Sequence, residues 1–325
     1  MIVNLVRTSD PRAVTRELVA LGLWVTPLEG GSQPQLRVEE GSRELPIGDI
    51  LAVSGVESVA RPRSAHPRVD AHPPTVRVRS LELGTGAPPV LIAGPCSVES
   101  EASAHALAHR VAAAGAKILR GGAYKPRTSP YSFQGHGGQA LEWLRAAADS
   151  HGLAVVTEVL DPEDAARVAE HADLLQIGSR SMQSSPLLRA AGATGKPVLL
   201  KRGMAATVEE WLLAAEHCLV AGAAAVIFCE RGVRGFDPST RNLLDLGAVA
   251  LLAGVRRLPV IVDPSHAVGR RDLVAPLARA ALAAGAAGVM LETHDSPGDA
   301  LSDGPQALTP AELTELAASL LGARA

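Results

Sequence analysis

Two patterns of apolar and polar positions follow one another along the chain. In residues 1–70, short apolar runs alternate with two segments of helical periodicity. Asp10 followed by Pro11 is a typical helix start, with an N-cap and a proline at the first helical position. Strands are predicted at 2–6, 23–27, 35–39 and 56–60, and helices at 11–21 and 47–53. This order of elements predicts a ferredoxin-like (βαββαβ) domain.

From residue 89 onward, strand and helix patterns alternate regularly. Short runs rich in Val, Leu and Ile are separated by Ala-rich helical segments such as 103–114 and 207–221. The predicted strands cover 90–94, 117–121, 154–159, 174–178, 198–201, 225–229, 260–263 and 288–292. Eight strand–helix pairs predict a closed, parallel (β/α)8 TIM barrel. An open sheet of six or seven strands is the alternative.

The stretch from 61 to 74 separates the two patterns. It holds four prolines and little apolar periodicity, which predicts a linker. Residues 75–83 then alternate polar and apolar positions before Gly84-Thr85-Gly86, which predicts a hairpin on the barrel floor. We therefore expect an α/β protein with a ferredoxin-like domain at 1–70 and the barrel at 71–325.

Composition narrows the class of protein. Of the 325 residues 47% are hydrophobic but only 2% are aromatic, which suits a parallel sheet wrapped in helices. The net charge of −3 gives no reason to expect nucleic acid or a membrane as partner. The sequence has three scattered cysteines and no apolar run of 18 residues, and its first ten residues lack the apolar run typical of a signal peptide. A reducing, cytoplasmic location is predicted.

Charged and polar residues gather where the predicted strands end. The carboxyl ends of barrel strands share one face, so these side chains are expected to line one cavity. So many cations would repel one another unless the ligand carries several negative charges, such as phosphates and carboxylates. Surface ion pairs are the alternative. The cationic set is Arg120, Lys125, Arg127, Arg180, Lys201 and Arg231, and Thr128 and Ser129 add hydroxyl donors.

A second set at the same face has metal-ligand character. Cys96, His266, Glu292 and Asp303 supply a thiolate, an imidazole and two carboxylates. This mixture suits Mn, Fe, Co or Zn better than Mg or Ca. The alternatives are a hydrogen-bonded histidine and a small buried cysteine without a metal.

At these residues the sequence resembles the 3-deoxy-D-arabino-heptulosonate 7-phosphate (DAHP) synthases of the short type, which carry an N-terminal ferredoxin-like domain. The likeness runs in order over nearly the whole barrel. It is carried by 92–99 (IAGPCSVE), 119–129 (LRGGAYKPRTS), 176–180 (QIGSR), 200–203 (LKRG), 229–232 (CERG), 262–266 (VDPSH) and 300–304 (ALSDG).

The resemblance implies a condensation of phosphoenolpyruvate with erythrose 4-phosphate, the first step towards the aromatic amino acids. It implies a divalent metal ion, Mn2+ first among the candidates, held by Cys96, His266, Glu292 and Asp303. Arg127 and Thr128 match residues that hold the phosphate of erythrose 4-phosphate. Lys125 and Glu158 are the expected catalytic residues. Phosphoenolpyruvate is expected to be bound by Arg120, Lys125, Arg180, Lys201 and Arg231.

Two other functions remain open. A 3-deoxy-manno-octulosonate 8-phosphate synthase uses arabinose 5-phosphate on a similar barrel, and a non-catalytic phosphometabolite sensor needs no Lewis acid. The resemblance also implies a homotetramer and an N-terminal domain that binds an aromatic amino acid effector; a purely oligomerising domain is the alternative. A chorismate mutase as an associated partner is left open.

Overall fold

The computed structural model describes residues 1–28, 33–39, 41–60, 64–125, 129 and 131–322. These form two compact units, Met1–Ala65 and His66–Ala325. The division lies five residues before the expected boundary at 70/71. The reason is that α3 (Pro67–Asp70) is bonded to the barrel helix α8 (Val208–Ala221): the backbone N–H groups of Arg68 and Val69 donate to the carboxylate of Glu216 at 2.9–3.1 Å.

The N-terminal unit has the predicted ferredoxin-like order. Its elements are β1 (Ile2–Leu5), α1 (Pro11–Ala20), β2 (Val25–Leu28), β3 (Gln35–Val38), α2 (Ile47–Leu51) and β4 (Val56–Ala60). The antiparallel sheet has the strand order β2-β3-β1-β4. Asp10 caps α1 by accepting from the N–H of Arg12 at 3.0 Å. Leu5, Leu18 and Leu36 are fully buried in the core of this unit.

Eight parallel strands close into a barrel, so the open sheet is excluded. The strands pair in sequence order, and the first pairs with the last, with Gly94 opposite Glu292. They are β7 (Val90–Gly94), β8 (Ile118–Arg120), β9 (Ala154–Val159), β10 (Leu174–Ile177), β11 (Val198–Lys201), β12 (Val226–Glu230), β13 (Val260–Val262) and β14 (Gly288–Glu292).

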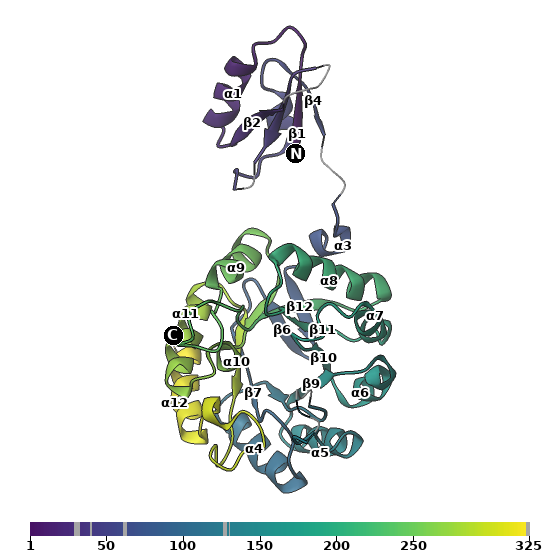
Figure 1. Cartoon of the computed structure of the whole chain (residues 1–325), viewed down its shortest axis with the longest axis vertical. Coiled ribbons are helices and arrows are strands. Elements are labelled where there is room, and N and C mark those ends of the chain that lie inside the picture. Colours follow the sequence, from purple (N-terminus) through teal and green to yellow (C-terminus); the bar gives the residue numbers. More distant parts are fainter. Residues whose placement is uncertain (29–32, 40, 61–63, 126–128, 130, 323–325) are drawn as a thin grey trace. The chain divides into compact units, whose positions relative to one another are not determined.

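Helices surround the barrel strands as an outer ring (Figure 1). Besides α8, the ring includes α4 (Glu101–Ala113), α5 (Gly138–Asp149), α6 (Ala165–His171), α7 (Ser185–Ala193), α9 (Leu246–Ala250), α11 (Val274–Ala283) and α12 (Pro310–Leu321). The short helix α10 (Pro264–Val268) lies inside the ring, directly after β13. Thr207 and Thr309 each begin a helix with a capping box that pairs them with Glu210 and Glu312. No helix in the described part of the chain is long and apolar enough to cross a bilayer.

Two apolar layers hold the barrel and leave its carboxyl end to polar groups. One lies between strands and helices and includes Trp211 packed edge-on against Phe228. The other fills the barrel interior, where Ile92 and Ile227 join Val76 and Leu83 of the hairpin β5 (Thr75–Val78) and β6 (Leu81–Gly84). Apolar side chains thus close the floor of the barrel, and the site lies at the opposite end.

Candidate active site

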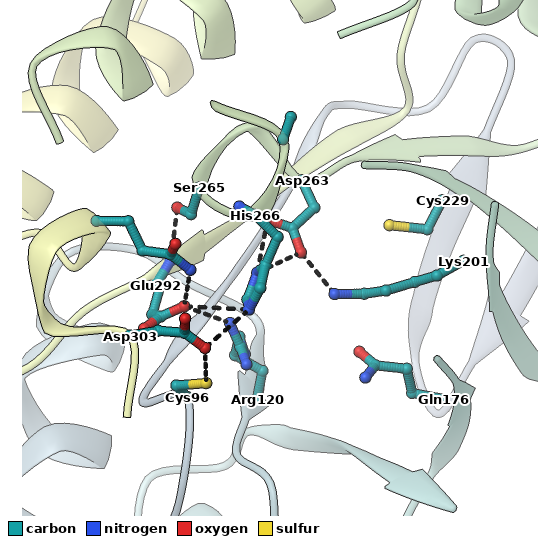
Figure 2. Close-up of polar contacts among 12 residues, drawn as sticks. Cys96, Arg120, Gln176, Lys201, Cys229, Asp263, Ser265, His266, Glu292 and Asp303 are labelled. Atoms are coloured by element: carbon teal, nitrogen blue, oxygen red, sulfur yellow. Dashed lines mark hydrogen bonds and ion pairs between the residues drawn. The ribbon is translucent and has the colours of Figure 1, made fainter. Parts of the chain in front are cut away.

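The four predicted metal ligands meet at the carboxyl end of three neighbouring strands (Figure 2). Cys96 follows β7 by two residues, Glu292 ends β14, and His266 lies in α10 directly after β13. Asp303 comes from the loop between β14 and α12, where its backbone has a φ of 53°. One donor atom from each of the four lies within 4.8 Å of all the others. The pairing of β14 with both β7 and β13 brings these distant segments together.

The contacts within this quartet fit a divalent cation. Asp303 Oδ2 lies 3.0 Å from Cys96 Sγ and 4.0 Å from His266 Nε2, and Glu292 Oε2 lies 3.3 Å from the same nitrogen. Burial raises the pKa of Glu292 to about 7, and burial together with Glu292 raises the pKa of the Cys96 thiol. Crowded acidic groups of this kind are expected where a bound cation supplies the missing positive charge.

Buried hydrogen-bond partners orient the side chains of the candidate metal ligands. Asp263, fully buried at the end of β13, accepts from His266 Nδ1 at 2.9 Å, so Nε2 faces the other ligands. Burial lowers the pKa of His266 to about 3, which keeps the imidazole neutral and able to coordinate. Gln306 Nε2 donates to Glu292 Oε2 at 2.9 Å, and Ser265 Oγ accepts from the backbone N–H of Glu292.

A cavity of about 370 Å3 lies beside the quartet. Among the residues that the structure describes, five of the six expected cationic side chains and Ser129 line this cavity. Arg127 and Thr128 lie outside the described residues. Arg231 is buried, and its Nη1 has no hydrogen-bond partner among the described residues. A buried donor of this kind indicates an anionic ligand. The lining residues are Arg120, Lys125, Ser129, Ser132, Glu158, Gln176, Gly178, Ser179, Arg180, Lys201, Met204, Arg231, Arg241, His266 and Asp303.

Two of the lysines connect the cavity to the quartet. Lys125 Nζ donates to the carbonyl oxygen and to the Sγ of Cys96, at 3.0 and 2.8 Å. Lys201 Nζ lies 2.5 Å from Asp263 Oδ2, so one carboxylate contacts both a cavity cation and His266 (Figure 2). Lys125 thus contacts a candidate metal ligand directly, and Lys201 contacts one through Asp263.

Glu158, the penultimate residue of β9, lines the cavity. Gln176 Nε2 donates to Glu158 Oε2 at 3.2 Å. Glycine at 178 leaves room for this carboxylate, because a Cβ there would lie 2.0 Å from Glu158 Oε1. The arrangement holds a carboxylate at the cavity wall, a position from which a side chain can exchange protons with a molecule in the cavity.

Some lining residues were not predicted. Gln176 could have been found as the polar residue in the otherwise apolar strand β10. Arg241 lies in the long loop after β12, far along the sequence from any strand end. Nothing in the local sequence indicates that it reaches Asp303, at 3.4 Å. Arg202, adjacent to Lys201, does not line the cavity; it pairs with Glu230 at 3.1 Å and with Asp245 at 2.8 Å.

Comparison with known proteins decides among the candidate functions. A sequence model of the DAHP synthetase I family matches residues 69–323. The chain belongs to this family. The phospho-2-dehydro-3-deoxyheptonate aldolase of Thermotoga maritima is 51% identical over 257 residues, which are 78% of this chain and 76% of that protein. A 2-dehydro-3-deoxyphosphooctonate aldolase of Acidithiobacillus ferrooxidans is 34% identical over 251 residues, 71% of this chain and 88% of the relative.

Solved structures similar to this chain belong to the same family. The crystal structure of the Thermotoga maritima aldolase, titled a DAHP synthase, has a TM-score of 0.76 and 42% identity, and covers 98% of this chain and 95% of that one. A truncated form of the Thermotoga maritima synthase has a TM-score of 0.72 and 44% identity, and covers 79% and 95%. The predicted family, fold and enzyme class, a 3-deoxy-7-phosphoheptulonate synthase, are therefore confirmed. The family is metal-dependent, in keeping with the quartet.

Proposed function

We propose that this chain condenses phosphoenolpyruvate with erythrose 4-phosphate and water, giving DAHP and phosphate, at the Cys96 quartet and the cavity beside it. The observation that carries the proposal is the meeting of four transition-metal donors with a cavity rich in cations. A sensor of phosphorylated metabolites would need the cations alone. The octulosonate reaction is the weaker alternative, because the relative with that name is less similar than the heptonate enzyme.

Cys96, His266, Glu292 and Asp303 are proposed to hold the metal ion, with Mn2+ the first candidate and Fe, Co or Zn compatible with the same donors. When bound, such an ion supplies a Lewis acid that polarises the aldehyde oxygen of the sugar phosphate. The chain's own contribution is the orientation of the ligands by Asp263 and Gln306, which leaves the donor atoms facing one another.

The cations are proposed to bind and orient the two phosphorylated substrates. Arg120, Lys125, Arg180, Lys201 and Arg231 would take the carboxylate and phosphate of phosphoenolpyruvate. The buried and unpartnered Nη1 of Arg231 supports this, because an anion would supply its missing acceptor. Arg127, Thr128 and Ser129 would take the phosphate of erythrose 4-phosphate. Alignment of the nucleophilic C3 with the aldehyde carbon then lowers the barrier through positioning.

Two side chains are proposed to move protons. Lys125 Nζ, which contacts Cys96, would donate a proton to the oxygen of the former aldehyde as the C–C bond forms. Glu158, held by Gln176, would accept a proton from the water that adds at C2, after which phosphate leaves by cleavage of its C–O bond. The acid would thus come from the loop after β8 and the base from β9, the next strand of the barrel.

The test is phosphoenolpyruvate consumption by chelator-stripped protein, with erythrose 4-phosphate or arabinose 5-phosphate, before and after addition of Mn2+. Turnover with the four-carbon sugar that requires Mn2+ is expected, and Cys96→Ala should lose it while Cys218→Ala, at a buried cysteine in α8, keeps it. Turnover with arabinose 5-phosphate alone would support the octulosonate reaction. No phosphoenolpyruvate consumption with either sugar would support the sensor.

The N-terminal domain is proposed to regulate the enzyme by binding an aromatic amino acid, in a homotetramer in the cytoplasm. Its separate core and sheet, Met1–Ala65, support a function distinct from that of the barrel. Regulation requires that the effector bind two states of the enzyme with different affinities. Two results together would contradict it: each aromatic amino acid leaves the turnover of the full chain unchanged, and a chain that starts at His66 turns over as fast as the full chain.

A further inference from the structure

The loop between β12 and α9, residues 231–245, connects the substrate cations with the metal ligands. It begins at Arg231 and folds back on itself, because the backbones of Val233 and Leu243 exchange two hydrogen bonds of 2.8–2.9 Å. A Cβ at position 232 would lie 2.7 Å from Cβ of Asn242, so the two arms of the loop are in close contact. This closure brings Arg241 and Asn242 back to the site.

Arg241 contacts the outer oxygen of a proposed metal ligand. Its Nη2 lies 3.4 Å from Asp303 Oδ1, whereas Oδ2 of the same carboxylate faces Cys96 Sγ at 3.0 Å. The two oxygens thus have different partners. Because Arg241 binds Oδ1, the Asp303 carboxylate is kept from rotating and presents Oδ2 to the other candidate ligands.

Asn242 holds the turn that carries the second ligand. It is buried, and its Nδ2 donates to the carbonyl oxygens of Ala267 at 3.2 Å and His266 at 3.4 Å. Backbone bonds add to this: the N–H of Arg241 donates to Val268 O at 3.0 Å, and that of Asn242 donates to Ala267 O at 2.9 Å. The loop therefore lies along the whole turn that positions the imidazole.

We propose that Arg241 and Asn242 are positioning residues for the metal ion, Arg241 through Asp303 and Asn242 through His266. The inference rests on the proposed metal centre. It also couples the two halves of the site, because the same closed loop begins at Arg231, where phosphoenolpyruvate is proposed to bind. Loss of a group that orients metal ligands typically weakens metal binding by about 10–100-fold.

The sign of the effect separates positioning from simple charge. Arg241 is a cation close to a cation site, so its repulsion alone would make Mn2+ bind more tightly once the charge is removed. Loss of orientation at Asp303 acts in the opposite direction and weakens binding. Arg234 is a matched control, since it is an exposed arginine of the same loop that does not line the cavity.

The experiment is Mn2+ binding to chelator-stripped full-length protein, followed by the electron paramagnetic resonance of free Mn2+. Arg241→Gln is expected to weaken binding by about 10-fold, Arg241→Lys by less, and Arg234→Gln not at all. Asn242→Ser should also weaken it. Because Arg241 is half-exposed, its variants should fold; circular dichroism checks this.

Binding by Arg241→Gln that equals or exceeds that of the wild type would overturn the inference, as would an equal loss in Arg234→Gln. The two proposals remain distinguishable through Cys96→Ala. If the wild type shows no Mn2+ site that this substitution removes, the proposed metal centre fails, and the inference fails with it. A Cys96-dependent site that Arg241→Gln leaves intact overturns the positioning role alone.

Discussion

Gly178 is the position at which one added methyl group would displace a proposed catalytic carboxylate. A Cβ there would lie 2.0 Å from Glu158 Oε1 and 2.9 Å from Glu158 Cδ, while ordinary contact begins at 3.4 Å. In a Gly178→Ala protein, Oε1 must therefore retreat by at least about 1.4 Å, and the 3.2 Å bond from Gln176 is expected to break. The displaced group is the end of a flexible side chain at the cavity wall, so the fold should tolerate the change.

The expected consequence is a loss of turnover rather than of stability. A misplacement of about 1 Å at a reacting group can cost roughly 100-fold in rate, and a positioned proton-transfer group contributes about 10²–10⁴-fold. We expect kcat to fall by about 100-fold, equivalent to about 2.7 kcal/mol of barrier. The KM for phosphoenolpyruvate should change little, because the cations that are proposed to bind it do not move. Gly254→Ala, where an added Cβ meets open space, is the control.

A double-mutant cycle tests whether the loss acts through Glu158. Initial rates of phosphoenolpyruvate consumption would be measured for Gly178→Ala, Glu158→Ala and the combination, each saturated with Mn2+ and both substrates. In the Glu158→Ala background the added methyl has no carboxylate to displace and should cost little more. An equal factor in both backgrounds would refute the reasoning, as would wild-type turnover in Gly178→Ala.

Two further predictions concern the buried charges. Asp263→Asn should lower the free energy of unfolding by roughly 3–5 kcal/mol, because Lys201 stays buried without its charged partner. Urea unfolding of chelator-stripped protein measures this, with Asp272→Asn at an exposed ion pair as the control. An unchanged urea midpoint in Asp263→Asn would contradict the prediction. Mn2+ binding at pH 7 should release between one and two protons, one from the Cys96 thiol, whose pKa burial raises, and a fraction from Glu292, whose pKa is about 7. The affinity should accordingly rise with pH, more steeply at pH 6 than at pH 8; titration calorimetry in two buffers checks this, and a pH-independent affinity would contradict it.

The sequence alone was sufficient for the order of the elements and the face on which the chemistry gathers. Helix starts such as Asp10-Pro11 and the capping box of Thr309 with Glu312 depend on residues within a few positions, so they can be recognised locally. Strand β7 coincides with the predicted 90–94 because its residues are uninterruptedly apolar. In a parallel barrel every strand's carboxyl end lies on one face, so polar residues there were predicted to share a cavity.

Which of those side chains contact one another was decided by the tertiary structure. Cys96 and Asp303 are 207 positions apart, and their contact exists only because β14 closes the barrel against β7. The pairing of Lys201 with Asp263 likewise depends on the curvature of three neighbouring strands. The reach of Arg241 back to Asp303 depends on a loop that folds on itself, with no periodicity to indicate it.

The boundary between the two units also shows the difference between what the local sequence indicates and what tertiary contacts decide. Proline-rich composition indicated a linker from 61 to 74, yet the barrel unit begins at His66 because the amides of Arg68 and Val69 bond to Glu216, almost 150 residues later. Local propensity and apolar periodicity act over a few residues, so they specify elements and the direction of their ends. The contacts within the proposed metal centre and the proposed anion site depend on closure over 200 residues, and only the folded barrel determines them.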